Sequence, residues 1–219
     1  MTVLEAYAYV TNALNKLSSN SGQNIPKDVF VRFFNSVQYQ WVEDRVKLNE
    51  LNKIRIDEIQ QLVTTVEIQS PTKKDQYYEF NLPTNYNHYI RSYSDLKGCG
   101  ISNWLVKEGD INVLLNDEFW KPSKEWGETI CTIGNEKIRV YYDDFTISKL
   151  NLVYYRYPVE INMADGFPDV NGNPTVDVDP EFRGSSLIEI LNLTVQALSG
   201  NIDDVNRYNV YSQNVQSHT

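Results

Sequence analysis

Apolar residues recur every three or four positions at the start of the chain, which is the spacing of an amphipathic helix. The first stripe comprises Val3, Tyr7, Val10, Leu14 and Leu17. Thr2 and Glu5 precede it with the spacing of a capping box, in which each residue satisfies a backbone N–H near the other. Residues 2–17 are therefore predicted to be helical.

A second helical stripe begins after Pro26, whose fixed φ suits the first turn of a helix. Its apolar members are Phe30, Phe33, Phe34, Val37 and Trp41. This helix is expected to run to about Leu48, and a third, shorter stripe predicts helix from Ile56 to about Thr64. Residues 1–64 are therefore predicted to form a helical hairpin or small bundle.

Between residues 65 and 162 the pattern changes to short runs of β-branched and aromatic residues. Strands or extended stretches are expected at 66–68, 77–80, 86–93 and 145–157, whereas 104–115 fits either a strand or a short helix. The clearest signal is a hairpin, in which two β-prone runs flank Gly134-Asn135 and favour a type II′ turn. This segment is predicted to be a mostly antiparallel β domain.

Residues 163–179 contain several Gly and Pro residues and are predicted to form a long, functional or mobile loop. Asp179 as N-cap and Pro180 as the first helical residue then predict a helix that ends at Gly200. Its apolar stripe consists of Leu187, Ile188, Leu191, Val195 and Leu198. A last helix is expected from about Asp203.

The predicted fold class is α+β. Its four segments are 1–64 (helical), 65–162 (β-rich), 163–179 (loop) and 180–219 (helical). Each terminal helix carries a single apolar stripe, and such a stripe needs a partner to cover it. The N- and C-terminal helices are therefore expected to pack together as one helical body, with the β domain as an insertion that projects from it.

The charge of the chain limits its partners. Its 219 residues carry a net charge of −9, which argues against a dedicated nucleic-acid binder and disfavours an anionic membrane surface. We also find no apolar run of the roughly 18 residues that span a bilayer, and the first residues lack the pattern of a signal peptide. Two cysteines, Cys99 and Cys131, are expected to stay unbridged.

Catalysis has no visible carrier in this sequence. As a nucleophile, Cys99 would need a histidine partner, and His88 lies eleven residues upstream. Gly98-Cys99-Gly100 lacks the third glycine of a dinucleotide-binding loop. The adjacent acids Asp143 and Asp144 fit a turn better than an acid–base pair. The sequence predicts a protein that is not an enzyme and needs no cofactor.

The acidic loop 169–173 has the spacing with which a calcium-binding EF-hand loop begins. Pro174 and Pro180 stand where that loop needs its glycine and its bidentate glutamate. Two interpretations stay open, a turn-rich loop and a different cation site that also uses Asp177 or Asp179. We predict that no metal is required.

Aromatic residues are frequent in the predicted β domain and the segment around it. The chain has 15 tyrosines and four tryptophans, of which Trp104, Trp120 and Trp126 fall in this part. Such residues suit a core and sheet face, a protein–protein interface or a sugar-binding platform. The sequence leaves these three uses open.

Several runs along the chain form a recognisable pattern. They are Val29–Gln38, Asp57–Leu62, Phe80–Pro83, Leu152–Pro158, Asp179–Phe182 ahead of 187–198, and finally Asp203, Asp204, Arg207 and Tyr208. Taken in this order, they resemble the head-to-tail connector proteins of tailed phages, the adaptor or ring proteins beneath the portal. The pattern is similar to that of the ring proteins of crAss-like phages, which infect Bacteroidota. The runs are spread along the chain, so that the resemblance extends over most of its length.

This resemblance implies a structural virion protein at the head-to-tail junction, made in the host cytoplasm. It implies a subunit of a homo-oligomeric ring, a dodecamer, that contacts the portal protein above and other tail or ring proteins below. DNA would pass through the channel without sequence-specific binding, which an acidic chain suits. The alternatives are a carbohydrate-binding module or another tail or tail-tube component.

In the connectors that this chain resembles, the C-terminal part reaches up to the portal. The corresponding stripe here is Val205, Tyr208, Tyr211 and Val215, spaced as one narrow apolar face among polar residues. Such a face is thin for a core helix and fits a helix laid in a groove of a partner. These four residues are the predicted partner-docking site, and a last helix packed on its own subunit is the alternative.

Overall fold

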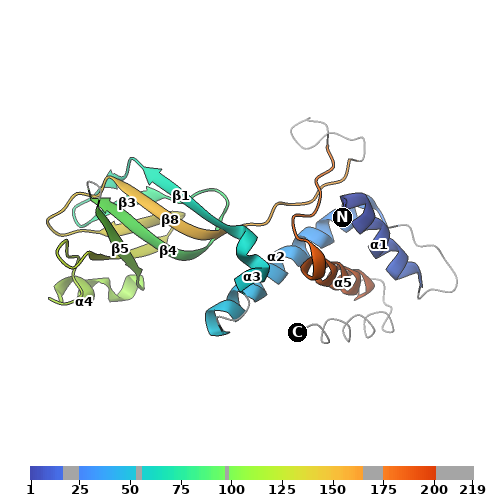
Figure 1. The fold of residues 1–219 in the computed structure, drawn as a ribbon, viewed down its shortest axis with the longest axis horizontal. Coiled ribbons are helices and arrows are strands. Elements are labelled where there is room, and N and C mark those ends of the chain that lie inside the picture. Colours follow the sequence, from blue (N-terminus) through green and yellow to red (C-terminus); the bar gives the residue numbers. More distant parts are fainter. Residues whose placement is uncertain (17–24, 53–55, 97–98, 165–174, 201–219) are drawn as a thin grey trace. The chain divides into compact units, whose positions relative to one another are not determined.

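The computed structural model describes residues 1–16, 25–52, 56–96, 99–164 and 175–200. It has a mixed α+β fold with helices at both ends and an antiparallel-rich sheet in the middle (Figure 1), which confirms the predicted class. The chain divides into two compact units, Gln61–Tyr157 and a second one that joins Met1–Gln60 to Pro158–Thr219. We call them the sheet unit and the helical unit.

The helical unit begins with the predicted capping box. Its helices are α1 (Val3–Lys16), α2 (Lys27–Asn52), α3 (Ile56–Ile59) and α5 (Gly184–Gly200). At the start of α1, the N–H of Thr2 donates to Glu5 Oε2 at 2.8 Å, and the N–H of Glu5 donates to Thr2 Oγ1 at 3.2 Å. The prediction for this helix start is therefore confirmed.

Aromatic rings fill the core of the helical unit. Phe30 lies 5.5 Å from the ring of Tyr7 on α1, and Trp41 lies 5.1 Å from Phe182, which precedes α5. The fully buried aliphatic residues include Val3, Ala6, Val10 and Leu14 of α1 and Leu187, Ile190, Leu191 and Val195 of α5. Ile188, which was predicted to be part of the α5 stripe, is 44% exposed, and Ile190 is buried instead.

After the sheet unit, residues 159–161 pack along α2, and two side-chain amides of α2 form hydrogen bonds with their backbone. Asn35 accepts the N–H of Ile161 at 2.9 Å and donates to the Ile161 carbonyl at 3.1 Å. Gln38 is fully buried and donates to the carbonyl of Val159 at 3.0 Å. Because Ile161 is buried, Asn35 satisfies backbone groups that would otherwise lack partners away from water.

The start of α5 differs from the prediction, because Asp179 does not cap that helix. The Asp179 carboxylate accepts the N–H of Val3 at 2.8 Å and so caps α1, 176 positions away in sequence. Glu181 accepts the N–H of Val159 at 3.0 Å, and Phe182 packs on Trp41. Residues 179–183 are thus used in tertiary contacts, and α5 begins at Gly184.

Arg45 is a buried cation that links three helices. Its side chain is 4% exposed, and Nη2 lies 2.6 Å from both carboxylate oxygens of Glu189 on α5. Its Nε lies 2.9 Å from Glu58 Oε2 on α3, an ion pair without an aligned hydrogen bond. The guanidinium also lies 5.1 Å from the ring centroid of Trp41. Such a cation is tolerated only because its partners compensate for lost water.

The sheet unit contains eight strands in the order β1-β8-β4-β5-β6-β7-β3-β2. They are β1 (Val63–Gln69), β2 (Thr72–Lys73), β3 (Tyr77–Asn81), β4 (Tyr86–Leu96), β5 (Cys99–Leu105), β6 (Glu128–Gly134), β7 (Lys137–Tyr141) and β8 (Lys149–Arg156). Every pair is antiparallel except β5–β6, which is parallel. The predicted mostly antiparallel character is confirmed.

Alternate residues of the strands point to one buried face. This core includes Tyr78 and Phe80 of β3, Ile138 and Val140 of β7, and Leu150, Leu152 and Tyr154 of β8. Val66 and Ile68 of β1, at the far end of the strand order, pack against the same cluster. The sheet therefore curls around this cluster.

The tight hairpin between β6 and β7 forms, but its turn is displaced by one residue. Gly134 pairs with Lys137, so the central residues are Asn135 and Glu136, whose φ values are 53° and 59°. Two positive φ values are the pattern of a type I′ turn, not the predicted type II′. The observed register places Ile133 opposite Ile138, whereas the predicted turn would have placed it opposite Glu136.

Three other predicted boundaries are corrected. The third helix ends with the 3₁₀ turn Gln60–Leu62, because Val63 and the next six residues pair with β8. The ambiguous segment 104–115 divides into the end of β5 and helix α4 (Ile111–Asn116), which follows the 3₁₀ turn η2 (Glu108–Asp110). The long strand predicted at 145–157 begins only at Lys149.

We expect Arg45→Met to lower the free energy of unfolding by about 3 kcal/mol, because the change leaves the largely buried Glu189 without its cation. Urea denaturation followed by circular dichroism measures the change. Arg32→Met is the matched control, since Arg32 forms an exposed pair with Asp28 on the same helix and should cost no more than about 0.5 kcal/mol. Equal losses in both variants would contradict the linking role of Arg45.

Candidate functional site

Four large aromatic side chains are exposed on the sheet unit, in and near the connection between β5 and β6. Trp104 is 52% exposed, Phe119 74%, and Trp120 and Trp126 are each 56% exposed. Together with Lys121, Ser123, Glu128, Thr129 and Ile130 they line a shallow hollow. We call these four aromatic residues the aromatic platform.

The parallel register of β5 and β6 places part of the platform. Trp104 lies opposite Ile130, and residues that face each other in adjacent strands point to the same face of the sheet. Glu128, two residues before Ile130, therefore shares this face with Trp104. An aromatic ring and a carboxylate thus lie side by side at the hollow.

Local hydrogen bonds shape the segment that carries the other three rings. Asp117 Oδ1 accepts the N–H of Phe119 at 2.8 Å, and Ser123 Oγ accepts the N–H of Trp126 at 3.3 Å. Backbone bonds join Ser123 and Glu128 in both directions, at 2.9 and 3.2 Å. As a result the Phe119 and Trp126 rings lie 6.2 Å apart, tilted by 31°. The platform is built by a turn with defined geometry.

A small apolar cluster anchors this connection to the sheet. Ile111 of α4 is buried with Ile130 of β6 and Tyr141 of β7, and Leu114 and Leu115 pack against them. The N–H of Val106 donates to the carbonyl of Cys131 at 3.0 Å and extends the β5–β6 pairing. Because the inner side of the connection is buried, its outer side presents the aromatic rings to solvent.

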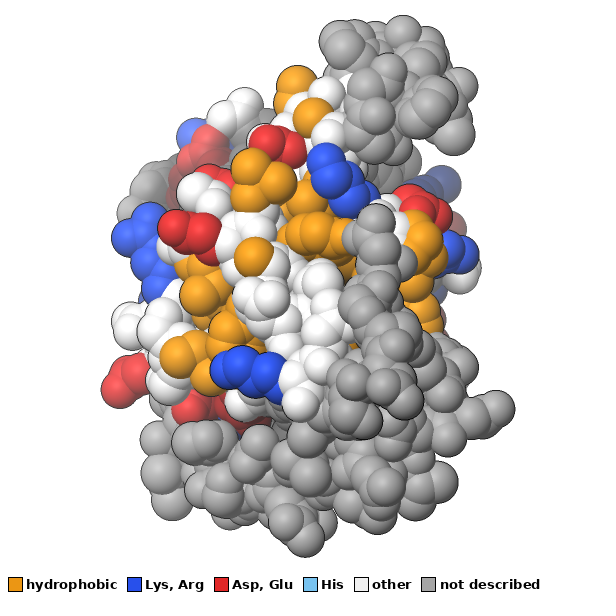
Figure 2. All heavy atoms as spheres, turned by 90° about the vertical axis from the view of Figure 1, so that its right-hand side faces the viewer, with side chains coloured by type: hydrophobic (Ala, Val, Ile, Leu, Met, Phe, Trp, Pro, Cys, Tyr) orange, Lys and Arg blue, Asp and Glu red, His pale blue; other side chains and the backbone are white. Residues whose placement is uncertain are grey.

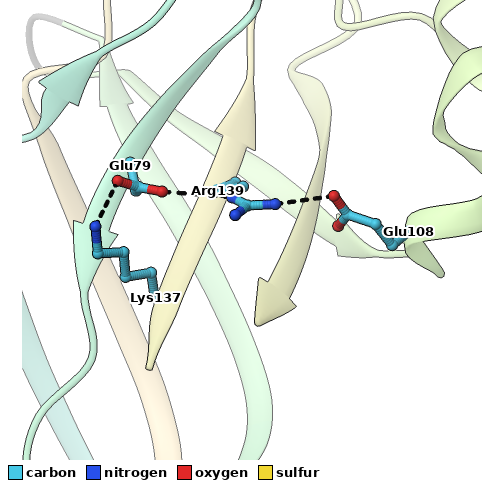
Figure 3. A network of polar contacts seen from close by, with 4 residues as sticks. All are labelled: Glu79, Glu108, Lys137 and Arg139. Carbon is cyan, nitrogen blue, oxygen red and sulfur yellow. Dashed lines mark hydrogen bonds and ion pairs between the residues drawn. The ribbon is translucent and has the colours of Figure 1, made fainter. Parts of the chain in front are cut away.

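A network of ion pairs, shown in Figure 3, joins the β5–β6 connection to strands β3 and β7. Glu79 of β3 lies 2.8 Å from Lys137 Nζ and 3.4 Å from Arg139 Nε, both on β7. Arg139 Nη1 in turn lies 2.9 Å from Glu108 Oε1, in η2. The hydrogen bond from Lys137 lowers the pKa of Glu79 below its ordinary value of 4.5, against the opposing effect of burial.

A buried polar cluster lies inside the curled sheet, around Tyr89 and Cys131. Asn103 donates to Ser92 Oγ at 2.9 Å, and the Tyr89 hydroxyl donates to the Asn103 carbonyl at 3.1 Å. Cys131 is a fully buried, free thiol whose pKa burial raises to about 11. Because the thiolate is the reactive form, burial lowers the reactivity of this thiol near neutral pH.

The residues predicted to dock a partner, Val205, Tyr208, Tyr211 and Val215, lie outside the described residues. The same holds for the calcium-like loop 169–173. Of the two acids that could have completed a cation site, Asp179 caps α1 and Asp177 accepts the N–H of Ala164 at 2.7 Å. Both carboxylates therefore have structural partners.

The structure does not bring the other candidate residues together. Cys99 pairs with Leu96 on β4, eight residues along the strand from His88. At about 3.3 Å per residue this separates their backbones by roughly 25 Å. Asp143 and Asp144 are exposed in the bend after β7. Within the described ranges, no group of three or more His, Cys, Asp or Glu side chains could hold a metal ion.

A second concave surface lies on the helical unit. A groove of about 590 Å³ runs between the first half of α2 and residues 160–163, with Lys27, Arg32, Tyr39 and Glu160 among its lining residues. Its charges are mixed. Figure 2 shows hydrophobic, acidic and basic side chains interspersed over the described part of one face of the molecule. The groove has no convergent set of catalytic groups among these residues.

Comparison with known proteins assigns the chain to no family. No protein-family model matches the chain, and no curated protein matches it. In the part of the chain that the structure describes, no helix is long and apolar enough to cross a bilayer. What indicates a function is the geometry of the described residues and the resemblance of the sequence pattern to connector proteins.

Phe119 is the platform residue that sequence reasoning missed. The sequence indicates Trp104, Trp120 and Trp126 as candidates, but it does not decide whether their side chains lie in the core or on the surface. A signal was present in the sequence, because Phe119 and Trp120 stand within 116–125, where most residues are polar or charged. A segment with so few apolar residues offers little buried surface for two large rings to join.

Removal of the Glu79 charge should cost stability in a pH-dependent manner. The pKa of Glu79 is lower in the folded chain than its ordinary 4.5, so the ionised carboxylate stabilises the fold above that pH. At pH 7 we expect Glu79→Gln to lower the free energy of unfolding by about 1 kcal/mol. This difference should shrink as the pH falls below 4.5 and wild type loses the same charge.

Urea denaturation at pH 7 and at several pH values below 4.5 measures this difference. Glu118→Gln, at an exposed acid of the same unit, is the control and should change stability little at any pH. A Glu79→Gln difference that stays constant down to the acid limit would show that the network is not held by this charge.

Proposed function

We propose that this chain is a structural, non-enzymatic subunit of a head-to-tail connector ring in a tailed phage, an adaptor beneath the portal. The observation that carries the proposal is the aromatic platform, a solvent-facing aromatic surface. Exposed tryptophans in such number are typical of protein interfaces. The resemblance of the sequence to connector proteins supplies the kind of assembly.

The helical unit is proposed to be the ring-forming body. The N- and C-terminal helices α1, α2 and α5 contact one another, and the buried Arg45–Glu189 pair joins α2 to α5. A body built from both ends of the chain can offer two different surfaces to its neighbours. Identical subunits that meet through two different surfaces form a ring when the rotation between neighbours closes, and we propose that this ring is a dodecamer.

The partners of this ring are the portal protein on one side and other tail or ring proteins on the other. Contact with the portal is assigned to the C-terminal stripe Val205, Tyr208, Tyr211 and Val215. DNA would pass through the channel without specific binding. The net charge of −9 supports this, because an acidic lining does not hold phosphates.

Carbohydrate binding is the second candidate function. The observation that favours it is the hollow of the platform, where aromatic rings lie next to Ser123, Glu128 and Lys121. Rings that stack on a sugar face and polar groups that bond its hydroxyls would be a suitable combination. A sugar-binding module of this size would stay a small particle in solution even with the portal present, whereas a connector subunit would form a ring, alone or on its portal.

Mass photometry distinguishes the two functions. We expect the purified chain to form a discrete particle of about twelve times 25.4 kDa, or to stay monomeric until its portal is added and then to form that particle. A stable two-fold dimer that ignores the portal would contradict the proposal. Binding of a soluble oligosaccharide by a permanent monomer would favour the second candidate.

Deletion of residues 202–219 should separate folding from docking. We expect a chain that still melts cooperatively but no longer co-assembles with the portal, because Gly200 ends α5 before this segment begins. Co-sedimentation with the portal measures the loss. A matched pair of double variants refines the test, with Tyr208→Ala and Tyr211→Ala on the stripe and Asn206→Ala and Gln213→Ala beside it.

Only the stripe variant is expected to lose portal binding. If the shortened chain docks normally, or if it fails to fold, the segment is not the docking element.

A further inference from the structure

The rim of the aromatic platform is acidic. Between positions 117 and 128 the chain has four acids and two lysines, which gives a net charge of −2. The acids are Asp117, Glu118, Glu125 and Glu128, and the lysines are Lys121 and Lys124. Three of the acids are exposed, and Glu128 lines the hollow beside the tryptophans. Open aromatic faces and carboxylates thus occupy one surface.

This combination favours arginine as the group that binds there. A guanidinium stacks on an indole face, where the ring quadrupole attracts it, and its N–H groups pair with carboxylates. The chain uses the same arrangement internally. Arg45 lies 5.1 Å from the ring centroid of Trp41 while it pairs with Glu189, and Arg139 lies 5.5 Å from that of Tyr77 while it pairs with Glu79.

The charge also distinguishes between possible occupants. A second copy of this chain brings a net charge of −9 toward an acidic rim, so its approach is opposed unless a basic patch meets the platform. Nucleic acid is opposed for the same reason. A basic protein segment is attracted from a distance by the carboxylates and held at short range by the rings.

We propose that the aromatic platform docks a basic, arginine-bearing segment of a different protein. Trp120 and Trp126 receive the guanidinium faces and apolar side chains, and Glu128 with the neighbouring acids pairs with the cations. This docking proposal depends on the proposed function in one respect, namely that the bound partner is a protein. It places a contact between different proteins on the sheet unit, separate from the ring contacts of the helical unit.

Isothermal titration calorimetry on the full chain at low salt tests this proposal. The probes are a peptide of four Arg-Leu-Gly repeats, the same peptide with Glu in place of Arg, and cellohexaose. We expect binding of the arginine peptide alone. Trp120→Ala and Glu128→Gln should each weaken it about tenfold, since each removes one half of the recognition. Higher salt should weaken it further.

Matched controls lie elsewhere on the sheet unit. Tyr157→Ala removes an exposed aromatic ring, and Asp75→Asn neutralises an exposed acid at the β2–β3 turn, three strands along the sheet from β6. Both should leave the affinity unchanged. An unaltered melting temperature shows that a variant is folded. If Trp120→Ala is not folded, Phe119→Ala is used in its place.

Three results would overturn the proposal. The first is no heat of binding with the arginine peptide up to about 1 mM, the weak limit of a specific contact. The second is equal binding by the platform variants, which would mean unspecific attraction to an acidic chain. The third is binding of cellohexaose that Trp120→Ala abolishes, which would make the platform a sugar site. Ring formation, measured on the same variants by mass photometry, tests the proposed function separately.

Discussion

Two neighbouring strands that run in the same direction cannot be joined by a hairpin, and the parallel pairing of β5 with β6 is the constraint from which the candidate site follows. All other paired strands of the sheet are antiparallel. The chain must therefore leave the sheet after Leu105 and return at Glu128. The intervening residues form η2, α4 and the turn that carries three aromatic rings. The connection that the parallel pair requires thus also carries the exposed aromatic platform.

The helical unit depends on contacts between residues far apart in sequence. Asp179 caps α1, Asn35 pairs with the backbone of Ile161, and Arg45 joins α2 to Glu189 of α5. Each of these interactions satisfies a polar group that the fold removes from water, so each is costly to break. Two of these contacts join α1 and α2 to residues 179 and 161, and the third joins α2 to α5, so each connects segments that the sheet unit separates in sequence.

The sequence predicted those features that depend on neighbouring residues. The capping box of Thr2 and Glu5 and the strand-like run before Pro158 need only short-range patterns, and both are present. The predicted start of α5 is wrong because Asp179 has the local sequence signal of a cap but caps the distant helix α1 instead. The hairpin turn was wrong by one residue because cross-strand pairing of Ile133 with Ile138, not the turn dipeptide, decides the register.

The platform could be predicted only in part. Composition indicated that tryptophans were concentrated in this region, but exposure depends on which face the parallel pair turns outward. The parallel pairing itself is a long-range property that no local pattern of β5 or β6 reveals. The predicted docking residues Val205, Tyr208, Tyr211 and Val215 stay a prediction, since they lie beyond the described residues.

The distribution of the four tryptophans has a spectroscopic consequence. Trp41 is 3% exposed in the helical unit, whereas the other three are more than half exposed in the sheet unit. Indole emission shifts to longer wavelength in contact with water, so the buried and exposed residues emit at different wavelengths. The blue edge of the intrinsic fluorescence therefore reports the helical unit, and the red edge reports the sheet unit. Unfolding of the two units can be followed in one unlabelled sample.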